Sequence, residues 1–84
     1  ARIVISAARE LGPRGISANV VNPGPIDTGW MDAETRDALT AHQPLGRLGV
    51  PRDIAGITAF LLSPEGRWIS GQLLHTDGGF SARY

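Results

Sequence analysis

The sequence predicts an α/β fold in which a helix is followed by a strand, two helices and a second strand. Two short runs, Ile16 to Val21 and Gln72 to Thr76, each lead into a glycine-containing turn, as strands buried in a parallel sheet do. Two segments of helical composition separate these runs. Strand, helix and strand in this order form a right-handed parallel crossover.

The first predicted helix covers Ala1 to Leu11, where apolar residues recur at helical spacing. It should end at Gly12-Pro13, because glycine suits a C-terminal cap and proline cannot continue a helix. Arg14-Gly15 then forms a turn. No capping side chain precedes the helix, so we interpret the sequence as beginning inside an element.

Two more helices are predicted between the strands. Asp32 should cap one from Ala33 to about His42, and Pro51 begins another that Ser63-Pro64 ends. Apolar residues occur on several faces of this last helix, so more than one face must be buried against other segments. The residues of the last helix and last strand that we expect on buried or intersubunit surface are Ile54, Ile57, Phe60, Leu61, Leu73 and Leu74.

Composition excludes several classes of protein. Eight basic and eight acidic residues cancel without forming blocks, so no partner role is predicted for nucleic acid or a membrane. The absence of a long apolar run and of a signal-peptide pattern predicts a cytoplasmic protein. The absence of cysteine excludes disulfides and thiolate chemistry, and His42 and His75 lack metal-ligand spacing, so no metal site is predicted.

The chain is also short for the fold it predicts. With 84 residues, it would bury only about 60–65% of its unfolded surface. The first strand pairs on one side only, and an open apolar edge is an aggregation hazard. The predicted architecture therefore needs a partner chain or a missing amino-terminal part.

The segment Asn22-Pro-Gly-Pro-Ile-Asp-Thr28 follows the first strand directly. Pro23 and Pro25 fix their φ angles and lack N–H groups, while Gly24 lets another molecule approach the backbone closely. Thr28 offers a hydroxyl and a following N–H at the mouth of the next helix, a place suited to an amide or a phosphate oxygen. The segment predicts a ligand loop at the carboxyl end of a strand, with an ordinary strand-to-helix turn as the alternative.

Six short motifs follow one another along the chain: Glu10 to Gly15, Asn19 to Thr28, Pro44 to Ala55, Phe60 to Ser63, Ile69 to Gln72 and Asp77 to Gly79. In order and spacing they resemble the carboxyl-terminal third of the short-chain dehydrogenase/reductase family. Each motif is weak alone, but together they are specific and span nearly the whole chain. The resemblance implies that residues 1–84 form the C-terminal part of a single NAD(P)-binding, Rossmann-like domain.

The resemblance also implies positions for ligands. The loop would meet the nicotinamide end of NAD or NADP, with the backbone near Ile26 holding the carboxamide; the cofactor-side residues are Pro23, Gly24, Ile26 and Thr28. Residues 29–48 resemble the family's variable substrate lid. Its candidates for lining the pocket of a small-molecule substrate are Trp30, Met31 and Leu39, for which ordinary packing under a loop is the alternative.

The residues that carry proton transfer in this family are not matched. The family uses Tyr-x-x-x-Lys with a serine, and an amino-terminal Gly-x-x-x-Gly-x-Gly loop for phosphate. Here the one tyrosine is Tyr84, all basic residues are arginine, and no Gly-x-Gly occurs. A tyrosine donates a proton at neutral pH only when a nearby cation lowers its pKa from about 10, so no catalytic residue is assigned.

The predicted function is therefore the C-terminal portion of an NAD(P)-dependent short-chain dehydrogenase/reductase, catalytically incomplete alone. Its partners would be further copies of the chain or a companion amino-terminal half. The alternatives are a non-catalytic association module that pairs with another chain, and one part of a longer polypeptide. Among single residues, Asp53 is interpreted as a helix-start charge, His75 as a packed strand histidine, and Arg47 as a solvated arginine that is also a candidate for touching phosphate.

Overall fold

The computed structural model describes residues 1–82. Its elements, in chain order, are α1 (Arg2–Leu11), the 3-10 turn η1 (Gly12–Arg14), β1 (Val20–Asn22), α2 (Ala33–Ala41), α3 (Pro51–Leu62), the 3-10 turn η2 (Pro64–Gly66) and β2 (Leu73–His75). This order, and the parallel pairing of the two strands, confirm the predicted fold class.

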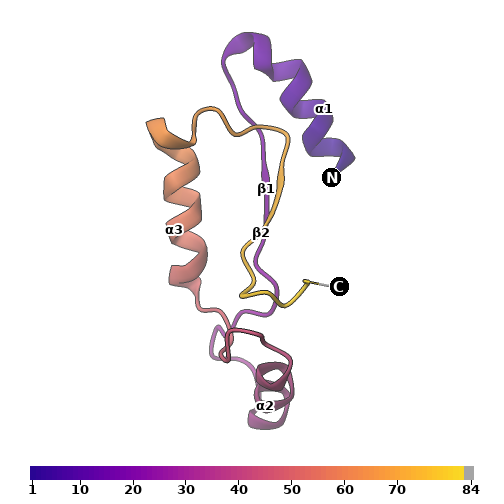
Figure 1. Cartoon of the computed structure of the whole chain (residues 1–84), viewed down its shortest axis with the longest axis vertical. Helices are drawn as coiled ribbons and strands as arrows, with labels where there is room; N and C mark the ends of the chain where they lie inside the picture. Colours follow the sequence, from indigo (N-terminus) through magenta and orange to yellow (C-terminus); the bar gives the residue numbers. More distant parts are fainter. Residues whose placement is uncertain (83–84) are drawn as a thin grey trace.

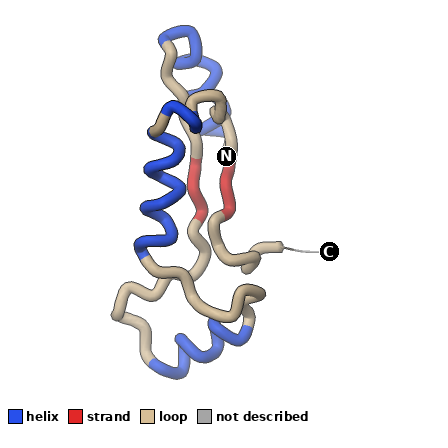
Figure 2. Tube along the Cα trace, turned by 60° about the vertical axis from the view of Figure 1, so that its left-hand side comes forward, coloured by secondary structure: helices blue, strands red, loops and turns tan. Residues whose placement is uncertain are grey.

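The two strands lie side by side, and α3 runs along them while α2 lies beyond their carboxyl ends (Figures 1 and 2). Val20 pairs with Leu73 and Asn22 with His75. Because the strands are parallel and pair in this register, their carboxyl ends lie at the same edge of the sheet. The loops that follow β1 and β2 are therefore brought together.

Both strands are shorter than predicted, because side chains replace part of the ladder. The amide of Asn19 donates to the Ile69 carbonyl at 3.0 Å and accepts from the Gln72 N–H at 3.0 Å. The Ser70 hydroxyl accepts from the Ala18 N–H at 3.2 Å. Ala18 and Asn19 are thus joined to the chain before β2 by side-chain bonds and by one backbone bond, from the Gly71 N–H to the Ala18 carbonyl at 2.7 Å.

Helix ends follow the capping residues with one exception. Asp32 caps α2 by accepting the Thr35 N–H at 2.7 Å, as predicted. Asp53 accepts the Val50 N–H at 2.8 Å, which confirms its place as a helix-start charge. Gly12, however, keeps a right-handed conformation and the chain continues into η1, so the left-handed stop lies at Gly15 with φ 76°.

Little of the apolar surface is covered within this chain. Among the described residues, the hydrophobic side chains that are buried are Val4 and Leu48, which remain 6% and 7% exposed. Total accessible surface is 6442 Å², against roughly 4,800 Å² for a closed monomer of this mass. Ile54, Ile57, Leu61 and Leu74 are half-buried, whereas Phe60 and Leu73 are exposed, so the last two are not buried by their own chain.

No helix among residues 1–82 has both the length and the apolar character needed to cross a membrane.

Candidate functional site

The Pro-Gly loop lies at the carboxyl end of β1, beside the turn that follows β2. Gly24 has φ 64°, and a Cβ on it would lie 2.7 Å from the Cβ of Asp77. The close approach that requires glycine here comes from Asp77 of the same chain. The glycine therefore lets the two loops pack together, and the approach of another molecule to Gly24 stays a prediction.

A second contact holds the loop from the side of α3. The Asp27 N–H donates to the Gly49 carbonyl at 2.9 Å, and the Gly49 N–H donates to the Pro25 carbonyl at 3.3 Å. A Cβ on Gly49 would lie 2.6 Å from Cδ1 of Ile26. The loop is thus fixed by Asp77 on one side and Gly49 on the other before any ligand binds.

Ile26 is one of several residues of this loop with backbone groups that make no hydrogen bond within residues 1–82. Within residues 1–82, neither its N–H nor its C=O has a hydrogen-bond partner. The side chain is half-buried against Gly49, so the backbone position is fixed. A donor and an acceptor on one residue are what a carboxamide, which has both groups, can bind.

Thr28 does not lie where the sequence predicted. Its side chain is exposed, but the Gly29 N–H that follows donates to Asp27 Oδ1 at 2.9 Å and is not free. The N-terminus of α2 begins only at Ala33 and is capped by Asp32. The expected use of a helix mouth is therefore wrong, because an aspartate turn separates Thr28 from the helix.

Asp27 is the residue of this segment that sequence reasoning missed. Its Oδ1 accepts the Gly29 N–H, and its Oδ2 lies 2.8 Å from Nε of Arg36 in α2. These bonds hold the pKa of the Asp27 carboxyl below its usual value, the Gly29 N–H being the larger cause. Arg36 also donates to the Met31 carbonyl at 3.0 Å.

The three predicted lid residues differ in exposure, and their role in lining a pocket stays a prediction. Trp30 is 93% exposed, while Met31 and Leu39 are half-buried, and no residue of α2 is fully buried. The segment 29–48 is held through Arg36 in α2 and, after the helix, through Gln43 and Pro44, which lie against Gly78 and Gly79.

The turn after β2 forms the other wall of the site. Asp77 is 8% exposed; its carboxylate accepts the N–H groups of Ser81 at 3.1 Å and Gly79 at 3.0 Å. Hydrogen bonds from Ser81, and then that of Gly79, keep the pKa of Asp77 below its usual value despite burial. His75 is exposed, with Nδ1 3.9 Å from Asp77 Oδ2, so its prediction as a packed histidine is wrong.

Arg47 is paired and not simply solvated, which corrects a further prediction. Its guanidinium donates to both carboxylate oxygens of Asp53, at 2.8 and 3.0 Å. Arg47, with the Val50 N–H next in importance, lowers the pKa of Asp53 to about 2. The pair fixes the loop that carries Gly49.

A small hollow of about 210 Å³ lies between this loop and the end of β2. Its lining residues are Leu45, Arg47, Gly49, Asp53, Thr76, Asp77 and Gly78. Gln43 Oε1 and Thr76 Oγ1 are buried without a hydrogen-bond partner within the described chain. Neither atom was predicted as notable, since nothing in the sequence shows which polar atoms become buried.

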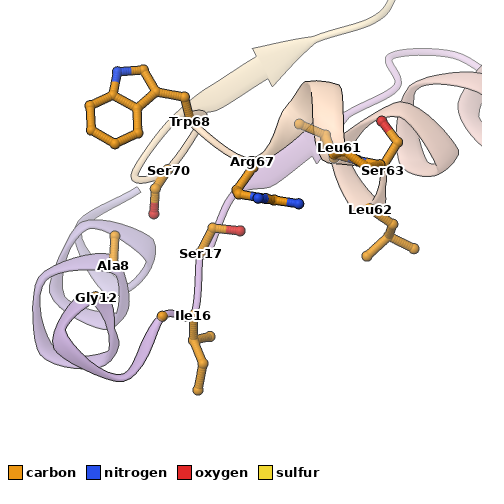
Figure 3. A pocket seen from close by; sticks show the side chains of 12 residues that line it. Ala8, Gly12, Ile16, Ser17, Leu61, Leu62, Ser63, Arg67, Trp68 and Ser70 are labelled. Atoms are coloured by element: carbon orange, nitrogen blue, oxygen red, sulfur yellow. The ribbon is translucent and has the colours of Figure 1, made fainter.

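A larger hollow of about 680 Å³ lies at the opposite end of the strands (Figure 3). It is lined by the end of α1, by Ile16 and Ser17 before β1, and by the end of α3 with Arg67 and Trp68. Ligands of parallel sheets bind at the carboxyl ends of the strands, which is where the Pro-Gly loop lies. No cluster of metal-ligating side chains occurs among residues 1–82.

Comparison with known proteins agrees with this geometry. A family model described as enoyl-(acyl carrier protein) reductase matches residues 1–81. An uncharacterized oxidoreductase of Bacillus subtilis is 51% identical over 75 residues, which cover 89% of this chain and 30% of that protein. The 3-oxoacyl-[acyl-carrier-protein] reductase FabG of Vibrio cholerae is 49% identical over 77 residues, covering 88% of this chain and 32% of that protein.

Solved structures give the same result. A blue fluorescent protein from a metagenomic library, in complex with NADPH, has a TM-score of 0.88 and 50% identity over 95% of this chain and 33% of its own. A short-chain dehydrogenase/reductase from Serratia marcescens has a TM-score of 0.89 and 43% identity over 95% and 34%. The chain spans about a third of the length of these proteins. With residues 1–81 matched by the family model and the strand-end loop in place, this chain belongs to the short-chain dehydrogenase/reductase family.

Proposed function

We propose that this chain forms the nicotinamide-side part of an NAD(P)-dependent short-chain dehydrogenase/reductase. The reaction of the whole enzyme would be hydride transfer between the nicotinamide and an alcohol or carbonyl carbon. The observation that carries the proposal is the backbone of Ile26, whose N–H and C=O have no partner within residues 1–82. The NADPH in the structure of a 50% identical protein supports the choice of ligand class.

In this proposal Ile26 binds the carboxamide through both backbone groups, and the exposed hydroxyl of Thr28 adds a contact to the carboxamide or a phosphate. Pro23 and Gly24 keep the loop rigid, so little entropy is lost when ligand binds. NAD(P) itself supplies the hydride chemistry. What these residues contribute is orientation, because the reacting atoms must be held close and aligned.

We further propose that the chain is catalytically incomplete by itself. It contains no lysine, and its one tyrosine is Tyr84, which lies outside the described residues. The proton that accompanies hydride transfer would need a donor from elsewhere in the polypeptide or from a companion chain. Whether NAD or NADP is used would be set by residues outside this sequence.

The test measures the binding of NADH and NADPH to the intact polypeptide that contains these residues, with nicotinamide fluorescence as the readout. We expect Thr28→Val to weaken binding of the preferred cofactor about three- to tenfold, the effect of one lost polar contact. Thr58→Val, on an exposed position of α3, is the matched control and should bind as wild type. Wild-type protein that binds neither cofactor contradicts the proposal.

The alternative function is an association module without catalysis, which the uncovered apolar surface favours. The two are separated by mixing the 84-residue chain with an amino-terminal half of a family member. Recovery of dehydrogenase turnover favours the enzyme portion. A chain that folds stably alone and has no affinity for either cofactor favours the module, and an intact mass of the source protein shows directly whether these residues are part of a longer polypeptide.

A further inference from the structure

Arg36 is the side chain that joins α2 to the Pro-Gly loop. Its Nε lies 2.8 Å from Asp27 Oδ2, and its Nη2 donates to the Met31 carbonyl at 3.0 Å. Within residues 1–82, no other side chain of α2 forms a hydrogen bond to the segment from Asn22 to Met31. The Thr40 hydroxyl donates to the Arg36 carbonyl at 2.7 Å, which is a bond within the helix.

Apolar packing does little to hold α2 in place. The helix has no fully buried residue, Trp30 before it is 93% exposed, and Leu39 is half-buried. When burial is small, the orientation of a helix depends on the few directed bonds at its surface. Arg36 makes two such bonds to different parts of the preceding loop, so it fixes both the distance and the rotation of α2.

Asp27 connects this contact to the proposed cofactor residues. It stands between Ile26 and Thr28, its N–H is bonded to Gly49, and its Oδ1 closes the turn over Thr28 by accepting from Gly29. One carboxylate oxygen thus shapes the turn that presents Thr28, and the other receives Arg36. A shift of α2 would act directly on the residue that positions the turn.

We propose that Arg36 is a positioning residue that couples the lid segment 29–48 to the cofactor loop through Asp27. This inference rests on the proposed function for its kinetic consequence, whereas the coupling itself is a property of the two loops. The side chains of Arg36 and Asp27 are 41% and 25% exposed. An ion pair of this exposure holds α2 with modest strength, which suits a segment that would have to admit substrate.

The test compares Arg36→Gln, Arg36→Lys, Asp27→Asn and the double variant Arg36→Gln/Asp27→Asn in the intact polypeptide. The first readout is the rate of limited proteolysis within residues 29–48, which requires no activity. We expect Arg36→Gln to raise that rate about three- to tenfold. Arg36→Lys should be intermediate, because lysine can pair with Asp27 but lacks the planar guanidinium that also reaches the Met31 carbonyl. Arg9→Gln on α1, exposed and without a side-chain partner among the described residues, makes the same charge change as a control.

The second readout is kinetic. We expect Arg36→Gln to raise KM for substrate and the Kd for cofactor about threefold or more, with a smaller change in kcat. If the two residues act through each other, the double variant should be no worse than the single variants. Proteolysis and KM equal to those of Arg9→Gln, or effects of Asp27→Asn and Arg36→Gln that simply add, would overturn the proposal. Loss of all cofactor binding in the wild type would contradict the proposed function, while the proteolysis series would still decide the coupling.

Discussion

At the scale of single residues, the site depends on positions where only glycine fits. Gly24 has a left-handed φ and meets Asp77, and Gly49 meets Ile26. Both contacts lie between segments that are distant in sequence. The glycines are visible in the sequence, but the atom that each one accommodates is not.

Gly24→Ala should therefore destabilise the protein. A Cβ at φ 64° is strained and would lie 2.7 Å from Asp77 Cβ, so the left-handed conformation alone costs about 1–2 kcal/mol and the overlap adds to it. Gly56→Ala in α3 is the control, because nothing lies within 4 Å of its Cβ position and alanine is the better helix former. Thermal unfolding should show opposite signs for the two variants; equal shifts would refute the assignment.

Thr76→Val tests the buried hydroxyl of the small hollow. Thr76 Oγ1 has no partner within the described chain, and a buried polar group without a partner is destabilising. Replacing it with a methyl group of similar shape should leave the melting temperature unchanged or raise it, whereas Thr76→Ser, which keeps the hydroxyl and opens a cavity, should lower it. A clear loss of stability in Thr76→Val would show that the hydroxyl is hydrogen-bonded in solution.

At the scale of elements, helix boundaries were largely predictable because their signals are local. Asp32 caps α2, and Asp53 accepts the Val50 N–H at the start of α3, as their positions in the sequence indicate. Strand lengths were less predictable. The side chain of Asn19 bonds to the chain before β2 and shortens β1. This bond joins segments that are distant in sequence, so local patterns do not predict it.

The start of α3 also gives a pH prediction. Arg47 and the Val50 N–H lower the pKa of Asp53 from 3.8 to about 2, so the carboxylate form is favoured in the folded state. The stability from this group is present above pH 3.8 and is lost as the pH falls through about 2. In a carboxyl-carbon NMR titration, Asp53 should titrate near 2, and Arg47→Gln should move it upward; an unchanged midpoint in the variant would remove Arg47 as the main cause.

At the scale of the whole molecule, the surface exceeds what a closed monomer has. The excess over the roughly 4,800 Å² expected is larger than the roughly 800 Å² that one partner buries in a standard interface. The radius of gyration, 15.2 Å, is likewise above the roughly 12 Å of a compact chain of this length. The uncovered apolar side chains include Ile3, Phe60, Leu62, Trp68 and Leu73.

The 84-residue chain alone should therefore associate at micromolar concentration. Sedimentation should give a mass above that of a monomer, and Leu62→Glu, at a position 83% exposed on α3, should lower it by placing a charge in the apolar surface. Ala38→Glu on the exposed side of α2 is the charge-matched control and should associate as wild type. A monomer in sedimentation would count against the intersubunit role of this surface.

The sequence by itself determined the order of elements, the parallel crossover, the family and the placement of the Pro-Gly loop at a strand end, because caps, breakers and short apolar runs act within a few residues. Only the tertiary structure decided what each loop residue touches: Gly24 lies against Asp77, Asp27 pairs with Arg36, His75 is exposed, and the Ile26 N–H and C=O have no partner within residues 1–82. These contacts depend on which distant segments the two strands bring together, and the local pattern of residues along the chain does not specify them.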